Sequence, residues 1–584
     1  MLAPPATKRP LLSLEFSPSF QVLLLCSVAN KKLASFDFHY KTNNNAECFG
    51  SSKLGEMLTV LGPNPKVQTT LLHTLSGKHH ALAELASGEF TANETEELFQ
   101  VMRHGFVVSK PQHMKTSTVE EELQFVFDLR FPNEQSADTR KSLVYDLLVS
   151  VNLLSKAKKQ VGTLARWELK RLALAVELIS LPNILFVDQP LADNRKADWE
   201  MIQILQALQR LQICQVVVSL HDPGSEIFQA VSNHLLMLNA LGSSLFVGNA
   251  NEALPHFAAL GYPLLDTHTS TGDHLLLCAE FAELDTLPPK ATNNPTGPYP
   301  AEKYPVKILP QRNQFGQFLL LLKREAYFCL RDKRVVYVRL FMAMFTMAVC
   351  AVVFLHVGNQ TPGYFVGSHF GSFVFPFFVN CFGVMVPTTL MLSEVKALLI
   401  RERSMRTYRL LPLLFAKLLP ELVINFAVAC IAIVIMYFSA GWTGNFMLLT
   451  CALFLLLESC ISYCYFFVFF FDSIVAALVM VVVTLVPQLL FMGTFVRQNQ
   501  LQNWLEWISY VCTVTYSLRI VSAVEFDPAK CTSDLVCSQW SGLLAANSTS
   551  KDSIWWYCMV LGFFFLIYRV LGFLAIQWAI KKQR

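Results

Sequence analysis

Residues 58–72 place a glycine and two threonines where an apolar strand would turn into a helix. They read Leu-Thr-Val-Leu-Gly-Pro-Asn-Pro-Lys-Val-Gln-Thr-Thr-Leu-Leu, which follows the spacing of the phosphate-binding loop G-x-x-x-x-G-K-[ST]. In that loop, glycines let backbone N–H groups wrap a phosphate, the lysine reaches its outer oxygens and a hydroxyl faces Mg²⁺. Gly62 and Thr69 keep their positions, and Thr70 adds a second hydroxyl.

Three other positions of the loop carry residues that cannot do this chemistry. Pro65 has no N–H to donate, Val67 stands at the second glycine and resists a positive φ, and Gln68 stands at the lysine and carries no charge. We therefore expect a nucleotide-binding loop that has lost its main contacts with phosphate. The alternative is an ordinary buried strand followed by a Gly-Pro turn and a helix.

The elements that must hold this loop belong to the first of two unlike halves. Residues 1–285 mix charged residues with many short apolar runs bounded by turn residues. No apolar signal segment precedes them, so we expect this half to stay in the cytosol. Residues 286–312 are rich in Pro, Asn and Thr and are expected to form an extended linker.

Residues 313–584 predict a transmembrane domain made of helices. Crossing about 30 Å of hydrocarbon takes roughly 20 helical residues, and a core helix of a soluble protein would not stay apolar on all sides over that length. Six stretches qualify, with a long outer loop at 497–553 before the last one. They lie at about 338–357, 367–390, 413–439, 446–470, 474–496 and 554–578.

Charged residues beside these stretches set the expected orientation. Lys396 and four arginines follow the second stretch, and Lys581, Lys582 and Arg584 end the chain. By the positive-inside rule these segments lie in the cytoplasm. We therefore expect a multi-pass protein of the plasma membrane or an endomembrane, with both termini cytosolic. The net charge of +4 is small and its basic residues gather beside the membrane, so we expect no nucleic-acid partner.

The same topology sorts three glycosylation sequons and a cysteine pair. Asn359 and Asn547 begin sequons in outer loops, where glycosylation is possible, whereas Asn93 falls on the cytosolic side. Cys531 and Cys537 share the long outer loop, where an oxidising compartment permits a disulfide. The other cysteines show no paired metal-binding spacing.

Glu458 is a carboxylate inside the fourth apolar stretch. Burying a charge in hydrocarbon is costly, so such a residue is by default a candidate for a transport function. The alternative is a hydrogen bond between helices with a polar neighbour such as Ser459 or Ser462.

Further segments resemble motifs of ATP-binding-cassette proteins of subfamily G. Residues 161–179 are similar to the signature helix, usually S-G-G-E-x-K-R, and residues 183–190 (Asn-Ile-Leu-Phe-Val-Asp-Gln-Pro) to the Walker B strand. Residues 216–228 resemble the H-loop strand, and 400–410 the cytoplasmic coupling segment of the membrane domain. The resemblance covers nearly the whole chain and implies a half-transporter of the white or sterol-transporter type. Its fold would be an α/β nucleotide-binding cassette followed by an all-α six-helix transmembrane domain.

The resemblance assigns roles to single residues. Asp188 would hold Mg²⁺ through water, together with Thr69, and His221 would be the intact H-loop histidine. Gln189 stands where the family has the Walker B glutamate. An amide can orient the attacking water but cannot accept its proton, so general-base assistance is lost.

The signature positions are altered as well. Ala165, Arg166 and Trp167 replace Ser-Gly-Gly, and only Glu168 remains, so the contacts that hold the γ-phosphate across a dimer are missing. The chain thus resembles a transporter ATPase that lacks its charge-stabilising groups. We therefore expect weak or absent binding of ATP and Mg²⁺ and no autonomous ATP hydrolysis. The implied nucleotide-binding set is Gly62, Gln68, Thr69, Thr70, Ala165 and Glu168.

Six spans supply only half of the usual pore, so the resemblance implies a dimer. We expect the catalytically impaired partner of a heterodimer with another subfamily G half-transporter. The pair would move a lipid-like, sterol-like or other hydrophobic molecule across a membrane. The alternative is a transport-inactive pseudo-transporter with a structural or regulatory role.

Overall fold

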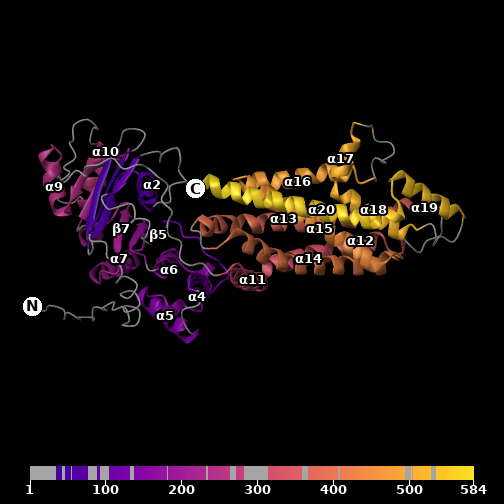
Figure 1. The fold of residues 1–584 in the computed structure, drawn as a ribbon, viewed down its shortest axis with the longest axis horizontal. Coiled ribbons are helices and arrows are strands. Elements are labelled where there is room, and N and C mark those ends of the chain that lie inside the picture. Colours follow the sequence, from indigo (N-terminus) through magenta and orange to yellow (C-terminus); the bar gives the residue numbers. More distant parts are fainter. Residues whose placement is uncertain are drawn as a thin grey trace, which may run out of the picture. The chain divides into compact units, whose positions relative to one another are not determined.

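The computed structural model of this chain contains two compact units, which lie within Met1–Arg312 and Asn313–Lys582 and are considered separately (Figure 1). The expected linker at 286–312 lies outside the described residues. The structure describes residues 35–41, 47–53, 56–76, 89–92, 104–131, 137–180, 182–231, 234–263, 271–281, 313–357, 366–404, 408–493, 502, 504–527 and 534–583.

A six-stranded sheet forms the centre of the first unit, in the order β5-β6-β7-β3-β8-β9. All neighbouring strands are parallel except β8 and β9. The strands are β3 (Met57–Leu61), β5 (His104–Val107), β6 (Ile184–Asp188), β7 (Gln215–Leu220), β8 (His234–Leu238) and β9 (Ser244–Gly248). A second, antiparallel sheet has the order β2-β1-β4, with β1 (Ser35–Lys41), β2 (Glu47–Lys53) and β4 (Glu89–Ala92).

Both faces of the six-stranded sheet are buried. Leu58 and Val60 pack on one face with α2 and the small sheet, whereas Met57 and Leu61 face the core formed with the other helices. Strands covered on both sides are apolar throughout, as the run Met-Leu-Thr-Val-Leu is. The helices of this unit are α2 (Pro65–Leu75), α4 (Val119–Arg130), α5 (Ala137–Ser150), α6 (Arg166–Leu178), α7 (Arg195–Arg210), α8 (Ser225–Val231), α9 (Ala250–Ala259) and α10 (Thr271–Phe281).

The strand order brings the sequence motifs to one edge. β6, β7 and β3 are neighbours and run in the same direction, so their carboxyl ends lie side by side. Gly62 follows β3, Asp188 ends β6 and His221 follows β7. This is the edge at which parallel α/β sheets bind ligands. The expected α/β class is confirmed, and the fold positions the loop as the motif pattern requires.

The second unit is helical, and its long helices run alongside one another in Figure 1. They are α12 (Lys333–Val353), α13 (Val366–Ser404), α14 (Leu410–Ala440), α15 (Phe446–Phe470), α16 (Ile474–Leu490) and α20 (Ile554–Gln583). The shorter helices are α11 (Gln314–Arg331), α17 (Glu506–Val511), α18 (Thr513–Glu525) and α19 (Asp534–Ala546).

Five helices in the described part of the chain are long and apolar enough to cross a membrane: α12, α13, α14, α15 and α20. α16 has 17 residues, and the end of the expected stretch 474–496 lies outside the described residues, so its crossing stays a prediction. α13 extends to Ser404, well beyond the expected end at 390. Its last turns contain neither Pro nor Gly, so nothing in the sequence stops the helix at the membrane surface.

Basic residues gather at one end of this unit. Lys396 of α13 donates from Nζ to the carbonyl oxygens of Val468 at 2.9 Å and Phe471 at 2.7 Å, at the carboxyl end of α15. Lys582 of α20 pairs with Asp472 just beyond that end. A lysine at a helix carboxyl end satisfies carbonyl groups that have no partner within the helix.

The opposite end is held by a buried carboxylate. Glu525 of α18 accepts hydrogen bonds from the N–H groups of Thr443 at 2.9 Å and Gly444 at 2.6 Å. A Cβ at position 444 would approach Glu525 to 2.7 Å, so the turn between α14 and α15 needs a glycine there.

Helix α11 is attached to the rest of the unit by buried ion pairs. Arg324 contacts Glu402 of α13 at 2.8 Å, and Glu325 accepts from Lys417 of α14 at 3.0 Å. The hydroxyl of Tyr408 also donates to Glu402. The helix before the first span is therefore connected to the segment that resembles the coupling region.

Candidate functional site

Gln68, at the lysine position of the loop, is turned back onto the protein. Its Nε2 donates to the carbonyl oxygens of Gly62 at 2.8 Å and Leu220 at 3.0 Å, and the residue is 0% exposed. Because both neighbours are carbonyls, the amide nitrogen and not the amide oxygen must face them. Gln68 therefore connects the loop after β3 to the end of β7, and its donor group is used inside the protein.

The backbone donors of the loop are used in the same way. α2 begins already at Pro65, and Asn64 caps it by accepting from the N–H of Lys66 at 3.1 Å. The N–H groups of Val67 and Gln68 point to the carbonyl oxygen of Asn64, at 3.1 and 3.3 Å. These three N–H groups are thus satisfied within the loop and do not point to a phosphate.

Asp188 collects hydroxyl donors at the end of β6. Thr69 Oγ1 lies 3.1 and 3.0 Å from its two oxygens, and Ser219 donates to Oδ1 at 2.8 Å. Ser109 is a further donor. Burial raises the pKa of this carboxyl, while the hydrogen bonds from Ser219, Thr69 and Ser109 oppose the rise. The structure brings Thr69 and Asp188 together and adds Ser219, which lies in the segment that resembles the H-loop strand.

Gln189 occupies a constrained turn directly after β6. Its φ of 47° lies in the left-handed region, which residues other than glycine seldom adopt. Its N–H donates to Ser219 Oγ at 3.0 Å, and its carbonyl accepts from Lys170 Nζ at 2.6 Å. Burial, with a smaller contribution from Arg166, lowers the pKa of the Lys170 amine to about 8. The peptide at the Walker B glutamate position is therefore held from two sides.

The start of α6 has also lost the groups with which a signature helix contacts phosphate. Ala165 is the N-cap and offers no hydroxyl, and its N–H donates to Glu168 at 2.9 Å. Arg166 and Trp167 stand where the family has glycines, and the Trp167 ring lies 4.6 Å from the guanidinium carbon of Arg171. Glu168 thus caps its own helix, and bulky side chains occupy the position of close backbone approach.

The remaining predicted residues divide between the site and its surroundings. The hydroxyl of Thr70 donates to the carbonyl of Lys66 at 2.8 Å, so it is used within α2 and does not face the site. His221 is exposed at the end of β7. The residues brought to the carboxyl edge of the sheet are Gly62, Gln68, Thr69, Asp188, Gln189 and His221.

These groups fit the metal part of a magnesium nucleotide but not its phosphates. Thr69 and Asp188 offer the oxygen ligands that Mg²⁺ prefers. The lysine position carries no cation, and the N–H groups of Lys66, Val67 and Gln68 are already paired. Gln68 Oε1 is buried without a partner among the described residues, which presents an acceptor where an anion needs donors.

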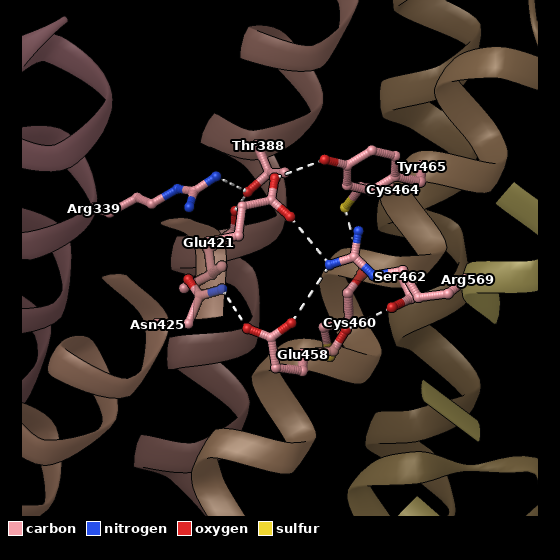
Figure 2. Close-up of polar contacts among 11 residues, drawn as sticks. Arg339, Thr388, Glu421, Asn425, Glu458, Cys460, Ser462, Cys464, Tyr465 and Arg569 are labelled. Carbon is pink, nitrogen blue, oxygen red and sulfur yellow. Dashed lines mark hydrogen bonds and ion pairs between the residues drawn. The ribbon is translucent and has the colours of Figure 1, made fainter. Parts of the chain in front are cut away.

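A second site lies between the membrane helices, where polar side chains form a buried cluster (Figure 2). Glu458 of α15 accepts from Asn425 Nδ2 of α14 at 2.7 Å and lies 3.5 Å from Arg569 Nη2 of α20. The same nitrogen lies 3.1 Å from Glu421 of α14, whose other oxygen accepts from the Tyr465 hydroxyl at 2.8 Å. One guanidinium therefore joins two carboxylates from different helices.

Aromatic packing and a second arginine complete this cluster. The guanidinium carbon of Arg569 lies 4.5 Å from the ring centre of Tyr465 and 5.6 Å from that of Phe565. Arg339 of α12, which is 1% exposed whereas the Arg569 side chain is 18% exposed, donates to Thr388 of α13 at 2.7 Å in the same view. Two cations thus accompany the two carboxylates, as the cost of burying charge requires.

Neither of the two serines named as alternative partners bonds to the carboxylate of Glu458. Ser462 donates to the backbone carbonyl of Glu458 at 2.8 Å, and Ser459 donates to that of Leu455 at 2.8 Å. The expected partners were wrong, because hydroxyls on a helix readily bond to the carbonyl four residues earlier. An arginine inside an apolar stretch, Arg569, is the signal in the sequence that could have identified the true partner.

The predicted sites in the outer loops are only partly described. Asn359 and Cys531 lie outside the described residues. Cys537 is disulfide-bonded. Because Cys531 lies outside the described residues, the pairing of Cys537 with Cys531 stays a prediction. Asn547 is described and is 7% exposed, close to Gly493. Its glycosylation also stays a prediction.

Two family models match the chain. The model described as ABC transporter matches residues 50–192, which include the loop, α6 and Asp188. The model described as ABC-2 type transporter matches residues 316–526 in the helical unit.

Several curated proteins are similar to the chain over much of its length. ABC transporter G family member 7 of Arabidopsis thaliana is 25% identical over 441 residues, 69% of this chain but only 59% of that protein. The ABC transporter ATP-binding protein/permease wht-1 of Caenorhabditis elegans is 23% identical over 525 residues, 82% of this chain and 77% of that protein. The broad substrate specificity ATP-binding cassette transporter ABCG2 of Sus scrofa is 23% identical over 521 residues, 80% of this chain and 78% of that protein. With a nucleotide-binding cassette ahead of an ABC-2 type membrane domain, and with G-type proteins among its relatives, the chain belongs to the ABC transporters of the G type.

Proposed function

We propose that this chain is the catalytically impaired half of a heterodimeric transporter. Together with an intact G-type half-transporter it moves a lipid-like, sterol-like or other hydrophobic molecule across a membrane. The observation that carries the proposal is the position of Gln68, whose amide bonds to Gly62 and Leu220 where the family's lysine would reach a phosphate. Autonomous ATP hydrolysis is therefore not part of the function.

The need for a different partner follows from the two altered elements of the cassette. In this family each ATP lies between the phosphate loop of one chain and the signature of the other. A homodimer would combine the Gln68 loop with the Ala165–Trp167 signature at both sites. In a heterodimer, each site would contain one intact element from the partner.

The membrane domain supports a role in transport. Glu421, Glu458 and Arg569 are costly to bury, yet they are mutually paired between α14, α15 and α20. The buried ion pairs of α11 connect the membrane helices to the coupling segment. An intact charged interior and an intact coupling region are what a pore-forming half requires.

The proposed orientation places the cassette in the cytosol. Lys396 and Lys582 both contact the segment around the carboxyl end of α15, which supports a single basic, cytosolic end for the bundle. Asn359 and Asn547 then carry glycans. Glycosidase treatment should shift the mobility of the chain, and the shift should shrink in Asn359→Gln and Asn547→Gln variants but not in Asn93→Gln.

Co-purification from native membranes tests the heterodimer. The tagged chain should retain an intact G-type half-transporter, and the pair should hydrolyse ATP slowly. The combined variant Ala165→Ser, Arg166→Gly and Trp167→Gly restores contacts to the nucleotide held by the partner. Because one preorganised donor contributes about 10²–10³ in rate, we expect at least a tenfold rise in turnover of the pair.

A matched variant separates this gain from a general effect on folding. Ala165→Gly alone restores no hydroxyl and should leave turnover unchanged. If no half-transporter co-purifies, or if the repaired signature leaves the pair as slow as before, the transport-inactive pseudo-transporter becomes the better description.

A further inference from the structure

A histidine and a glutamate from different helices meet at the end of the bundle opposite to Lys396 and Lys582. His369 lies three residues after Val366, where α13 begins, and Glu525 is the last residue of α18. Nε2 of His369 lies 3.2 Å from Oε1 of Glu525, and the two side chains are 12% and 0% exposed. This nitrogen makes no hydrogen bond of good geometry among the described residues. The imidazole therefore approaches the carboxylate closely without being bonded to it.

Glu525 already holds the turn between α14 and α15. The N–H groups of Thr443 and Gly444 donate to its two oxygens at 2.9 and 2.6 Å, and Thr443 Oγ1 donates at 3.2 Å. A group that only accepts hydrogen bonds acts as a carboxylate, and a buried negative charge is stabilised by a positive charge beside it. His369 is the titratable group in contact with Glu525 that can supply one.

Aromatic rings surround this pair. The imidazole stacks on Phe373 with 5.6 Å between the ring centres and meets Phe526 edge-on at 5.0 Å. Phe373 stacks in turn on Trp442 at 4.0 Å, and Trp540 of α19 meets Phe526 at 5.7 Å. Because these rings exclude water, an attraction between opposite charges is screened less here than at the protein surface.

Two further titratable residues belong to the elements at this end. Asp527 lies two residues after Glu525 and is 6% exposed. His356 follows α12, and its backbone N–H donates to the carbonyl of Ser439 at the end of α14. The turn between α14 and α15 carries no titratable side chain. A test of the pair must therefore separate the titration of His369 from that of Asp527 and His356.

We propose that His369 and Glu525 form a proton-sensitive lock that joins α13, α18 and the turn between α14 and α15. Imidazole side chains change charge between pH 5 and 8. When His369 is protonated, it pairs with Glu525 as a cation and tightens the lock. When it is neutral, the carboxylate keeps only its donors in the turn, and the lock is looser. The contact therefore strengthens as the pH falls.

The compartment that sets this pH follows from the proposed orientation. Lys396 and Lys582 mark the cytosolic end of the bundle, so the lock faces the cell exterior or the lumen of an organelle. It would be tight in an acidified compartment and looser at a neutral cell surface. The chemistry of the lock depends on the geometry of the pair alone, whereas the compartment rests on the proposed orientation.

Hydrogen exchange of the purified full chain in lipid nanodiscs tests the lock. The N–H groups of Thr443 and Gly444 exchange when their bonds to Glu525 open, and mass spectrometry of peptides covering 441–446 measures this opening. Dividing each rate by the intrinsic rate at the same pH removes the chemical pH dependence of exchange. Protection of these N–H groups should be roughly tenfold greater at about pH 5.5 than at about pH 8. In His369→Gln the protection should be the same at both pH values.

Three further variants assign the effect to this pair. His369→Lys keeps its charge at both pH values and should retain the protection of the acid form throughout. Asp527→Asn and His356→Gln leave the pair intact and should keep the pH dependence of the parent chain.

Protection that does not change with pH in the parent chain would overturn the proposal. So would a pH dependence that survives in His369→Gln, or one that disappears in Asp527→Asn or His356→Gln, because another group would then be titrating. Low protection of His369→Lys at both pH values would show that a fixed charge does not tighten the turn. Glycosylation of Asn359 reports the orientation separately, so an absent lock and a lock on the cytosolic side can be told apart.

Discussion

The phosphate loop and the membrane cluster treat charge in opposite ways. At Gln68 the motif's cation is replaced by an amide that bonds to two carbonyl groups. Around Arg569, ionised groups remain buried and are paired with one another. A neutral hydrogen bond contributes about 0.5–1.5 kcal/mol and can be lost singly, whereas a buried charge is tolerated only while its partners are present. The Gln68 amide of the loop therefore keeps its donor group hydrogen-bonded without a ligand. The charges of the cluster stay paired only while each of its members is present.

The largest expected effect tests the dependence of the cluster on its arginine. Arg569→Met would leave Glu421 and Glu458 facing each other without a cation. Breaking a buried ion pair in this way costs about 3–5 kcal/mol. We expect a large loss of folded chain and a lower melting temperature in detergent, measured by size-exclusion chromatography with heating.

Two further variants distinguish lost charge from lost packing. Adding Glu421→Gln and Glu458→Gln to Arg569→Met removes the unpaired charges and should recover much of the folded chain. Arg569→Lys keeps the charge but loses the planar contacts with both carboxylates and should fall in between. If the triple variant is as unstable as Arg569→Met, packing and not charge governs the cluster.

The next effect concerns the loop and the groups that a phosphate would need. Pro65→Gly, Val67→Gly and Gln68→Lys together should free backbone donors and supply a cation. Hydrogen bonds to charged groups contribute about 1.5–3 kcal/mol, so ATP affinity should rise at least about tenfold, measured by fluorescent nucleotide titration.

Gln68→Lys alone is the informative control for this repair. It adds the cation but leaves the N–H groups of Val67 and Lys66 bonded to Asn64. Its gain in affinity should be much smaller than that of the combined variant. An equal gain would mean that charge alone limits nucleotide binding.

A smaller effect follows from the buried Lys170. Its pKa is lowered from 10.5 to about 8, so between these values the unfolded chain binds a proton that the folded chain has released. The free energy of unfolding should therefore rise with pH across this window, by at most about 1.4 kcal/mol per pH unit. Below about pH 8 both states are protonated and this contribution no longer changes with pH.

The measurement compares the parent chain with Lys170→Met. Denaturant unfolding of both at several pH values removes the contribution of other groups. The difference between them should grow in favour of the parent chain as the pH rises. A difference that stays constant would show that Lys170 titrates normally in the folded protein.

A further effect concerns the hydroxyl donors of Asp188. Ser219→Ala removes a donor to this carboxylate and an acceptor for the N–H of Gln189. We expect a loss of about 1–3 kcal/mol in unfolding free energy for groups left unsatisfied. Ser219→Thr, which keeps the hydroxyl, should retain more of the stability, and equal losses would indicate a steric cause.

The sequence predicted the fold well because the relevant signals are local. Apolar runs bounded by turn residues mark the strands β3, β6 and β7, and long apolar stretches mark the membrane helices. The sequence predicted an apolar strand before Gly62 and a strand that contains Asp188, and the strand order of the structure brings their ends together. Helix ends were less predictable, as the extension of α13 to Ser404 shows, since a helix can continue beyond the membrane wherever no residue stops it.

Hydrogen-bond partners could not be predicted in the same way. The identity of Gln68 indicated a missing charge, but its bond to Leu220 spans 152 positions of the sequence. The contact of Arg569 with Glu458 spans 111 positions. Such pairings depend on which helices and strands lie side by side, and no local pattern encodes that.

By itself, the sequence determined the element types, the two unlike halves and the chemical groups available in each. Residue type sets charge, hydrogen-bonding capacity and backbone freedom wherever a residue lies, so the absence of a loop lysine or a signature glycine was decided before folding. Only the tertiary structure decided that the Gln68 amide bonds to two carbonyls and that Arg569 bridges two carboxylates. Burial removes water as an alternative partner, so each buried polar group must be satisfied by whichever group the fold brings beside it.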